Sequence, residues 1–183
     1  MTSTTEQVVL LDSNYQPIGT ADKAGIHDEN TPLHLAFSCY LFNDQGQVLL
    51  TRRSLDKVAW PGVWTNSFCG HPLPDEVFSD ALHRRAEYEL GAKIADIRSV
   101  CEDFQYYAKD SSGVVENEFC PVFQARLTSE LAPRASEVAD YAWIDFDDLL
   151  QSVQTAPFAF SPWMREQLSH RDLVAHLKQG LMA

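Results

Sequence analysis

The segment from Gly70 to Gly91 constrains the fold of this chain most, because its glycines and apolar spacing define a loop that leads into one helix. Between Pro74 and Gly91 an apolar residue recurs at every fourth position, namely at Phe78, Leu82, Ala86 and Leu90. This period, followed by a glycine, is typical of an amphipathic helix with a left-handed cap. The sequence therefore predicts a helix over residues 74–90 with one face in a core.

The polar residues of the same segment resemble a Nudix box. The frame of that box is kept by Gly70, Glu76, Arg84, Glu89 and Gly91. Two of its acidic positions are instead occupied by Arg85 and Tyr88. A Nudix hydrolase clusters those acids on one helix to hold the metals that activate water. A chain that keeps the frame without the acids is expected to bind a diphosphate without cutting it.

Arg85 and Glu89 stand four residues apart and share one face of the predicted helix. The alternative to a role in a site is an exposed ion pair, which would contribute little.

Length and charge limit the class of protein. A chain of 183 residues is long enough for one domain with a full core, so residues 1–183 are expected to form a single domain. The net charge of −12 disfavours nucleic acid and anionic membranes as partners. A phosphate ligand would then need metal ions or a local basic patch, for which the candidates are Lys23, Arg52, Arg53, Lys57, Arg84 and Arg85.

The chain contains neither a leader-like start nor an apolar run near the ~20 residues that cross a bilayer. A cytoplasmic protein without a membrane partner is expected, as a monomer. The four cysteines, at 39, 69, 101 and 120, could form two disulfides, but reduced thiols are expected because nothing marks the chain as secreted.

The order of elements predicts an α/β (α+β) fold, an αβα sandwich with a mixed sheet. Helices are expected over 74–90, from about 147, and over 161–178, where Ser161-Pro162 supplies a cap and a first-turn proline. Residues 57–72, rich in Trp, Gly and Pro, are expected to be an ordered loop. Strands are expected over 8–11, 34–42, 47–52, 99–108, 114–126 and 141–144.

Glu116 and Glu118 alternate along a predicted strand, so both carboxylates lie on one face, which continues into Cys120 and Val122. Two acids on a face that turns apolar would be costly if buried without a partner, which favours a bound cation. The alternative is a solvated end of an edge strand, which Pro121 supports.

Three histidines offer nitrogen ligands, although a lone histidine in such places is usually a surface or capping group. His27, His34 and His71 would combine with the two carboxylates into a set suited to six-coordinate Mn²⁺, or to Zn²⁺ in an expanded geometry. Their spacing alone does not bring them together. Cys69 precedes Gly70 and His71 outside any Cys-x-x-Cys motif, so it is either a core cysteine or an exposed thiol near a turn.

Long, unusual strings resemble the type I isopentenyl-diphosphate delta-isomerase family over nearly the whole chain. These strings are Ala59-Trp60-Pro61-Gly62-Val63-Trp64-Thr65, then Thr65-Asn66-Ser67-Phe68-Cys69-Gly70-His71-Pro72, Val115-Glu116-Asn117-Glu118 and Phe160-Ser161-Pro162-Trp163. The resemblance implies a Nudix-like fold, a small allylic or homoallylic diphosphate as substrate, and an isomerase that works through a tertiary carbocation in isoprenoid biosynthesis.

The resemblance also implies roles for individual residues. A divalent metal, Mn²⁺, Zn²⁺ or Mg²⁺, would be bound by His27, His34, His71, Glu116 and Glu118. A Mg²⁺ that accompanies the diphosphate would be held by Glu89 and the carbonyl of Cys69. The phosphates would be met by Lys23, Arg53, Lys57 and Arg85. Cys69 and Glu118 would form the acid/base pair, in either order, with Trp163 facing the cation and Tyr106, or its neighbour Tyr107, beside Glu118.

Two other functions compete with the isomerase. A Nudix hydrolase of nucleoside diphosphate derivatives would need the acids that Arg85 and Tyr88 replace. A non-catalytic module that binds diphosphate or metal would give Cys69 and Trp163 no special purpose.

Overall fold

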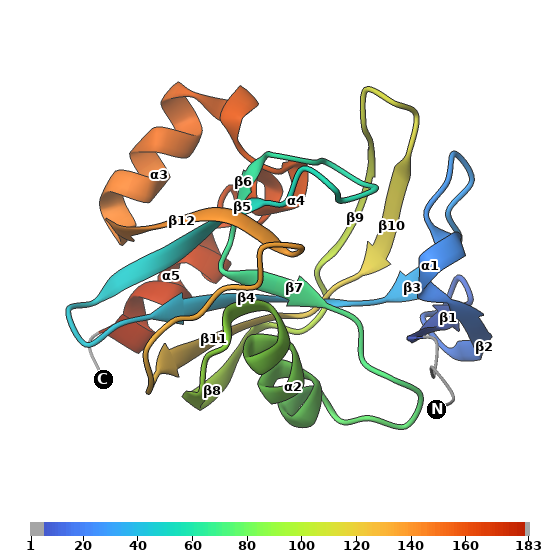
Figure 1. The fold of residues 1–183 in the computed structure, drawn as a ribbon, viewed down its shortest axis with the longest axis horizontal. Coiled ribbons are helices and arrows are strands. Elements are labelled where there is room, and N and C mark those ends of the chain that lie inside the picture. The colour runs from blue at the N-terminus through green and yellow to red at the C-terminus, as the bar shows by residue number, and fades with distance from the viewer. Residues whose placement is uncertain (1–5, 182–183) are drawn as a thin grey trace.

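A computed structural model describes residues 6–181 and contains two β-sheets that share the cavity described below (Figure 1). The larger sheet has the strand order β12-β5-β4-β11-β8, with β6 paired to β5 and β7 paired to β4. The β4–β11 pair is parallel and the other pairs are antiparallel, so the sheet is mixed, as predicted. Its strands are β4 (Phe37–Phe42), β5 (Gln47–Arg53), β6 (Trp64–Thr65), β7 (Phe68–Gly70), β8 (Ile94–Cys101), β11 (Val122–Leu127) and β12 (Val138–Asp145).

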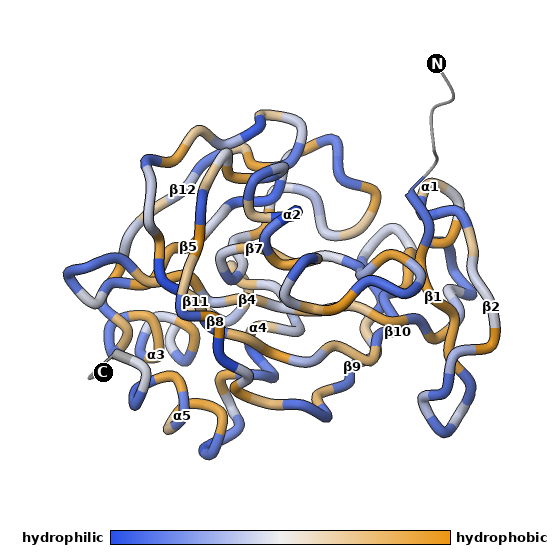
Figure 2. Tube along the Cα trace, turned by 90° about the horizontal axis from the view of Figure 1, so that it is seen from below, coloured by the Kyte–Doolittle hydropathy of each residue, from blue (hydrophilic) through white to orange (hydrophobic). Residues whose placement is uncertain are grey.

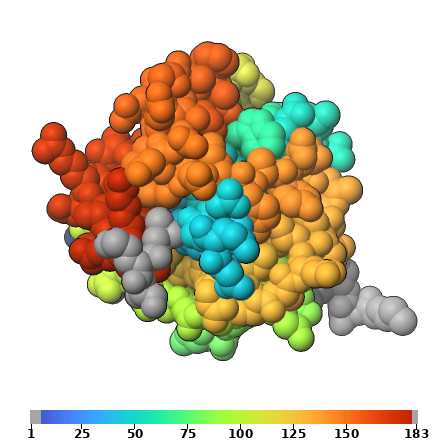
Figure 3. All heavy atoms as spheres, turned by 90° about the vertical axis from the view of Figure 1, so that its left-hand side faces the viewer, coloured from blue at the N-terminus to red at the C-terminus, as the bar shows by residue number. Residues whose placement is uncertain are grey.

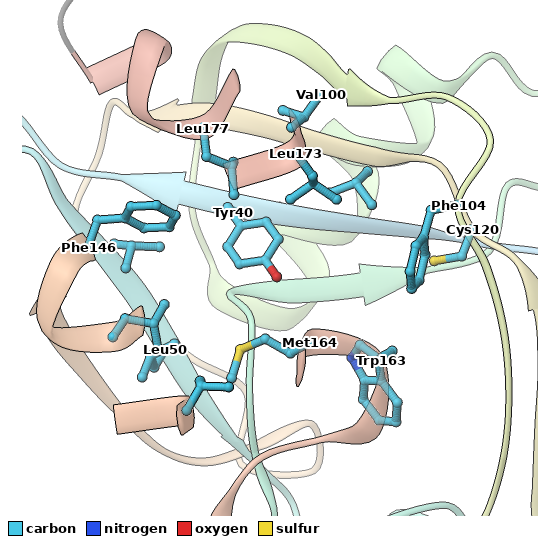
Figure 4. Packing of buried hydrophobic residues seen from close by; sticks show 14 of the residues in the cluster. Tyr40, Leu50, Val100, Phe104, Cys120, Phe146, Trp163, Met164, Leu173 and Leu177 are labelled. Atoms are coloured by element: carbon cyan, nitrogen blue, oxygen red, sulfur yellow. The ribbon is translucent and has the colours of Figure 1, made fainter. Parts of the chain in front are cut away.

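Helices cover both faces of the larger sheet, which gives the predicted αβα sandwich. On one face, α2 (Phe78–Leu90) packs Leu82, Ala86 and Leu90 against Phe37 and Leu49. On the other face lie α3 (Phe146–Thr155), α4 (Pro162–Gln167) and α5 (Arg171–Leu181), with the short 3-10 helix η1 (Pro157–Ala159) between α3 and α4. Figure 4 shows the apolar side chains of this second face around the ring of Tyr40.

Helix α2 ends as its sequence predicts. Gly91 follows it with φ 59°, a left-handed conformation, and its N–H donates to the Glu87 carbonyl. A Cβ at this position would lie 2.7 Å from the carbonyl oxygen of Ala132, so the glycine serves both the turn and a close backbone approach.

A second sheet, not predicted from the sequence, has the order β2-β1-β3-β10-β9. It forms one end of the molecule together with the four-residue helix α1 (Lys23–Ile26) and the long β9–β10 hairpin (Figure 1). Figure 3 looks onto the opposite end, where the β4–β5 turn (cyan) lies. The strands of the second sheet are β1 (Gln7–Leu11), β2 (Pro17–Asp22), β3 (His34–Leu35), β9 (Gln105–Lys109) and β10 (Val115–Phe119).

Three expected strands are wrong in length, because each is divided between the two sheets. The expected strand 34–42 divides at Ala36 into β3 and β4, and 99–108 divides at residues 102–104 into β8 and β9. The expected strand 114–126 divides at Cys120 and Pro121, whose ring removes a donor from the ladder.

The C-terminal helix is also shorter than expected, because the chain stops being helical at residues 168–170 and α5 starts anew. The loop 57–72 contains two short strands, β6 and β7. Apolar and polar segments alternate along the strands, and the turns at the margins are mainly hydrophilic (Figure 2). Over the described residues, the helices are too short and too polar to cross a bilayer. The single domain stays a prediction.

Candidate active site

A cavity of about 370 Å³ is lined by residues of both sheets and of α1, α2 and α4. The residues to which the family resemblance gives a role, with Tyr106 as the tyrosine, all contribute to this lining except His34, whereas the basic candidates Arg52 and Arg84 lie outside it. His34 is fully buried directly behind the wall, where its Nε2 lies 3.4 Å from Oε1 of Glu118. Residues spread from Lys23 to Trp163 along the chain therefore meet at one place.

The three predicted histidines converge on the two carboxylates. Ligand atoms of His27, His34, His71 and Glu118 all lie within 4.8 Å of one another. Glu118 Oε1 is 3.1 Å from His71 Nε2, and Glu116 Oε2 is 3.1 Å from His27 Nε2. Both carboxylates are buried, so the alternative of a solvated strand end is wrong. Strand β10 is also an inner strand of its sheet, between β3 and β9.

Strand register explains part of this convergence. Glu118 pairs across the sheet with His34 on β3 and with Tyr106 on β9, so the three side chains are cross-strand neighbours on one face of the sheet. The Tyr106 hydroxyl donates to Glu118 Oε2 at 2.8 Å, which leaves Oε1 to face the imidazoles. Tyr106 is buried while Tyr107 is 64% exposed, so Tyr106 is the tyrosine that faces the cavity.

The ring of His34 has a defined tautomer. Its Nδ1 lies 2.9 Å from the Pro32 carbonyl oxygen, which can only accept, so Nδ1 carries the proton. The lone pair of Nε2 is thereby directed at the cluster, the arrangement in which a histidine binds a metal.

Burial and neighbouring charges set the protonation of the cluster. Burial lowers the pKa of His71 to about 3, so this imidazole is neutral at neutral pH. Burial alone would raise the pKa of Glu118, but the neighbouring imidazoles of His34 and His71 outweigh burial and lower that pKa. Burial opposes the charged form of His34, but the contact with Glu118 outweighs burial and raises the pKa of this imidazole, so a divalent cation would have to displace a proton from it.

The cluster fits a divalent metal. Among the described residues, His27 Nε2, His34 Nε2 and Glu116 Oε2 are buried without a hydrogen-bond partner. An unsatisfied buried polar atom costs about 1–3 kcal/mol, and a cation at the centre would satisfy all three. Nitrogen and oxygen donors in this number suit Mn²⁺, Zn²⁺ or Mg²⁺.

Two frame residues of the Nudix-like segment support the loop that carries His71. Arg84 Nε donates to Glu76 Oε1 at 2.7 Å, and Arg84 Nη2 donates to the His71 carbonyl at 3.0 Å. Glu76 Oε2 also accepts from the N–H of Leu73. The kept part of the box therefore anchors residues 71–76 to α2.

Arg85 and Glu89 form a buried pair, with relative exposures of 3% and 8%, so the alternative of an exposed ion pair is wrong. Arg85 Nε donates to Glu89 Oε1 at 3.1 Å. The guanidinium remains charged because neighbouring carboxylates, Glu89 first, raise its pKa against the opposing effect of burial. A permanent cation therefore lies in the cavity wall at a position where hydrolases carry an acid.

Two carboxylates that the sequence analysis missed hold the other cations in place. Lys23 Nζ lies 2.9 Å from Glu6 Oε2, and Lys57 forms an ion pair with Glu137. Glu137 Oε2 is also 3.4 Å from Arg85 Nη2. Glu6 and Glu137 belong to no motif, and only proximity in the fold joins them to the site.

The Cys69 thiol lines the cavity and is surrounded by neutral polar groups. Its Sγ lies 3.4 Å from Ser38 Oγ, 3.3 Å from Asn66 Nδ2 and 3.4 Å from Asn66 Oδ1. Burial raises the pKa of this thiol to about 12, and nearby Glu118 adds to the rise. The group at this wall is a thiol rather than a thiolate.

Trp163 closes the apolar end of the cavity. Its ring is 2% exposed and lies 5.7 Å, between centroids, from the rings of both Trp60 and Tyr106. The Arg53 guanidinium carbon is 5.2 Å from the Trp163 ring centroid, so this face already accepts a cation. Arg53 is anchored by its Nη2, which donates to the Ala59 carbonyl at 2.7 Å.

The chain matches the family model of the NUDIX domain over residues 32–167, and it belongs to the Nudix family. Two relatives define its place there more closely. A Kocuria rhizophila protein named isopentenyl-diphosphate Delta-isomerase is 57% identical over 91% of this chain and 92% of its own. One of the same name from Paenarthrobacter aurescens is 59% identical over 87% of each chain. The chain is thus a member of the isopentenyl-diphosphate delta-isomerase family.

Solved structures agree on the fold alone. DR0079 from Deinococcus radiodurans superposes with a TM-score of 0.68 at 18% identity, over 90% of this chain and 98% of that one. The NUDIX domain of Shewanella oneidensis NrtR, complexed with ADP ribose, gives a TM-score of 0.55 at 20% identity, over 80% and 87%. Family membership and the His/Glu cluster together indicate that the chain binds a divalent metal.

Proposed function

We propose that this chain interconverts isopentenyl and dimethylallyl diphosphate by adding a proton at one end of the allylic unit and removing one at the other. The observation that carries the proposal is that one cavity contains a half-buried thiol, Cys69, a buried carboxylate, Glu118, and an aromatic ring, Trp163. The relatives named for this reaction, at 57% and 59% identity, support it.

Cys69 is the proton donor when isopentenyl diphosphate is consumed, and Glu118 is the acceptor. The thiol has only neutral polar groups within hydrogen-bonding distance, which favours the protonated form. Glu118 faces imidazoles and accepts from the Tyr106 hydroxyl, which favours the carboxylate. The Trp163 face stabilises the tertiary cation between the two transfers by ~2 kcal/mol or more, about thirtyfold in rate. The surrounding aromatic side chains exclude the water that would capture it.

His27, His34, His71, Glu116 and Glu118 would hold one divalent metal, and Glu89 with the Cys69 carbonyl a Mg²⁺ beside the diphosphate. When bound, the first ion fixes the Glu118 carboxylate and the second offsets phosphate charge. Lys23, Lys57 and Arg85 meet the phosphates, and Arg53 does so from its place over Trp163. All four cations line the cavity.

The experiment that tests the proposal is isomerisation in heavy water, followed by NMR. Solvent deuterium is expected at carbon in both isomers, with the diphosphate intact, because each turnover passes a proton between enzyme and carbon. The hydrolase alternative requires phosphate release in step with substrate loss and no carbon-bound deuterium. A binding module leaves the spectrum unchanged, and either result would overturn the proposal.

Gly70→Ala is expected to weaken pyrophosphate binding about tenfold, or ~1.4 kcal/mol. A Cβ at Gly70 would lie 2.7 Å from Cγ of Arg85 and 2.9 Å from the Phe37 ring, so the guanidinium must leave its place. Titration calorimetry with magnesium pyrophosphate measures the change. Gly25→Ala is the control, because a Cβ there meets nothing within 4 Å. Equal affinity in the two variants would contradict the placement of Arg85.

A further inference from the structure

The side-chain amide of Asn66 is fully buried at the corner between β6 and β7, and it contacts two groups of the proposed reaction. Asn66 Nδ2 lies 3.3 Å from Cys69 Sγ. Asn66 Oδ1 accepts from the indole Nε1–H of Trp163 at 3.0 Å, although the two residues are 97 positions apart in the chain. One amide therefore bridges the proposed proton donor and the ring that faces the cation.

Other hydrogen bonds fix the orientation of this amide. Nδ2 donates its two hydrogens to the carbonyls of Cys39 and Phe68, at 3.1 and 3.0 Å, so the thiol of Cys69 donates to Oδ1, which lies 3.4 Å from Sγ. Because carbonyls can only accept, the nitrogen must lie on that side, and Oδ1 must face Trp163. Thr65 Oγ1 donates to the same Oδ1 at 2.9 Å.

The helix that carries Trp163 is docked on the same corner. Ser161 caps α4 by accepting from the Met164 N–H, and its own N–H donates to the Trp64 carbonyl at 2.8 Å. Ser161 Oγ is also 2.8 Å from Thr65 Oγ1. The start of α4 is thus held beside Asn66.

We propose that Asn66 is a positioning residue, whose amide holds the Cys69 thiol and the Trp163 ring in register so that both meet the same substrate. This inference rests on the proposed function. A proton donor must lie within hydrogen-bonding reach of the carbon it protonates, and a misplacement of about 1 Å can cost 100-fold in rate. Cys69 and Trp163 come from β7 and α4, and Asn66 is hydrogen-bonded to both of them.

Ser67 provides a matched control. It is also fully buried and next in the chain, and it joins strands in the same way, accepting from the Leu41 N–H and donating to the Leu49 carbonyl, each at 2.7 Å. Its hydroxyl has no hydrogen bond to Cys69 or Trp163 among the described residues. Ser67→Ala therefore measures what the loss of a buried polar link at this corner does by itself.

The kinetic test compares Asn66→Ala with Ser67→Ala in the metal-loaded protein. Asn66→Ala is expected to lower kcat at least tenfold while KM changes less than about threefold, because among the described residues the Asn66 side chain has no hydrogen bond to any of the four cations assigned to the phosphates. Ser67→Ala is expected to lower the melting temperature but to keep kcat. If Asn66→Ala kept kcat, or if both variants lost kcat in proportion to stability, the inference would be overturned.

A milder variant covers the case in which Asn66→Ala does not fold. Thr65→Val keeps the shape of Thr65 but removes the hydroxyl that donates to Asn66 and docks Ser161. It is expected to lower kcat severalfold at unchanged KM. An unchanged kcat would count against the inference.

A spectroscopic test does not depend on activity. The indole N–H resonance of Trp163, identified by its loss in Trp163→Phe, is expected to shift in Asn66→Ala and to stay in place in Ser67→Ala. Failure of the deuterium experiment would remove the proposed function and leave this shift intact. An unshifted resonance in Asn66→Ala would overturn the positioning role even in an active isomerase.

Discussion

Removal of divalent metal is expected to lower isomerisation at least a hundredfold, with recovery on addition of Mn²⁺ or Mg²⁺. The reason lies in the His/Glu cluster, where the ligand atoms of His27, His34, His71 and Glu118 are within 4.8 Å of one another. Without a cation, the Glu118 carboxylate is held by the imidazoles of His34 and His71, and it is a poorer acceptor for a proton from the substrate. Exhaustive chelation, metal analysis of the protein and the isomerisation assay measure this together.

Stability supplies an independent readout of the same site. Binding to the folded state alone raises the unfolding free energy by about 2.7 kcal/mol at 100-fold excess over Kd. His27→Ala and Glu116→Gln, which each remove one ligand, are expected to lose most of the metal-induced rise in melting temperature. An exposed change such as Glu87→Gln is expected to keep it. Full turnover by a protein shown to contain no metal would refute the role of the cluster.

The alternation of Glu116 and Glu118 could be predicted, because a strand places every second residue on the same face. The convergence of the histidines could not be derived from spacing. His34 reaches Glu118 through the parallel pairing of β3 with β10, and that pairing depends on a second sheet that local patterns do not reveal. The convergence of these histidines was predicted only from the resemblance to a family, because the periodicity of the sequence gives no information on it.

The burial of Arg85 and Glu89 could not be predicted from the sequence either. Four-residue spacing predicts that they share a face of α2, but it cannot tell whether that face meets solvent or a cavity. Glu6 and Glu137, the other ion-pair partners of Arg85, come from outside the helix. Nothing in the surrounding sequence distinguishes these two glutamates from other acidic residues. Asn66 belongs to one of the strings that carry the family resemblance, yet only its hydrogen bonds to Cys69 and Trp163 give it a role.

Short non-strand segments between the two sheets explain why three strands were predicted too long. Each divided strand leaves one sheet and enters the other at a short break, and at residues 120–121 the break includes a proline. Around residues 120–121 the apolar pattern continues because both sides are buried, with Cys120 at 1% and Val122 at 0% exposure, whereas the interruption at 102–104 contains exposed Glu102 and Asp103. A continuous apolar pattern therefore concealed the corner that brings Glu118 to the cavity.

Cys69→Ala and Glu118→Gln are each expected to lower kcat at least a thousandfold while the Kd for magnesium pyrophosphate changes less than about threefold. Each removes one of the two proton carriers, and a carbocation mechanism cannot turn over with only one of them. Neither side chain forms an ion pair with Lys23, Lys57 or Arg85 in the described structure, so phosphate binding is preserved. Single-turnover and steady-state assays, with calorimetry for Kd, separate the two effects.

Arg53→Ala is expected to have the opposite effect, with a change in binding rather than in turnover. Its guanidinium lies over Trp163, its Nη2 donates to the Ala59 carbonyl, and it is one of the four cations assigned to the phosphates. This variant is expected to weaken binding and raise KM while kcat falls much less. Near-normal turnover by Cys69→Ala would make Cys69 a core cysteine that happens to line the cavity. In that event the proton donor would have to be sought among the other groups of the lining, of which Tyr106, hydrogen-bonded to Glu118, is the first candidate.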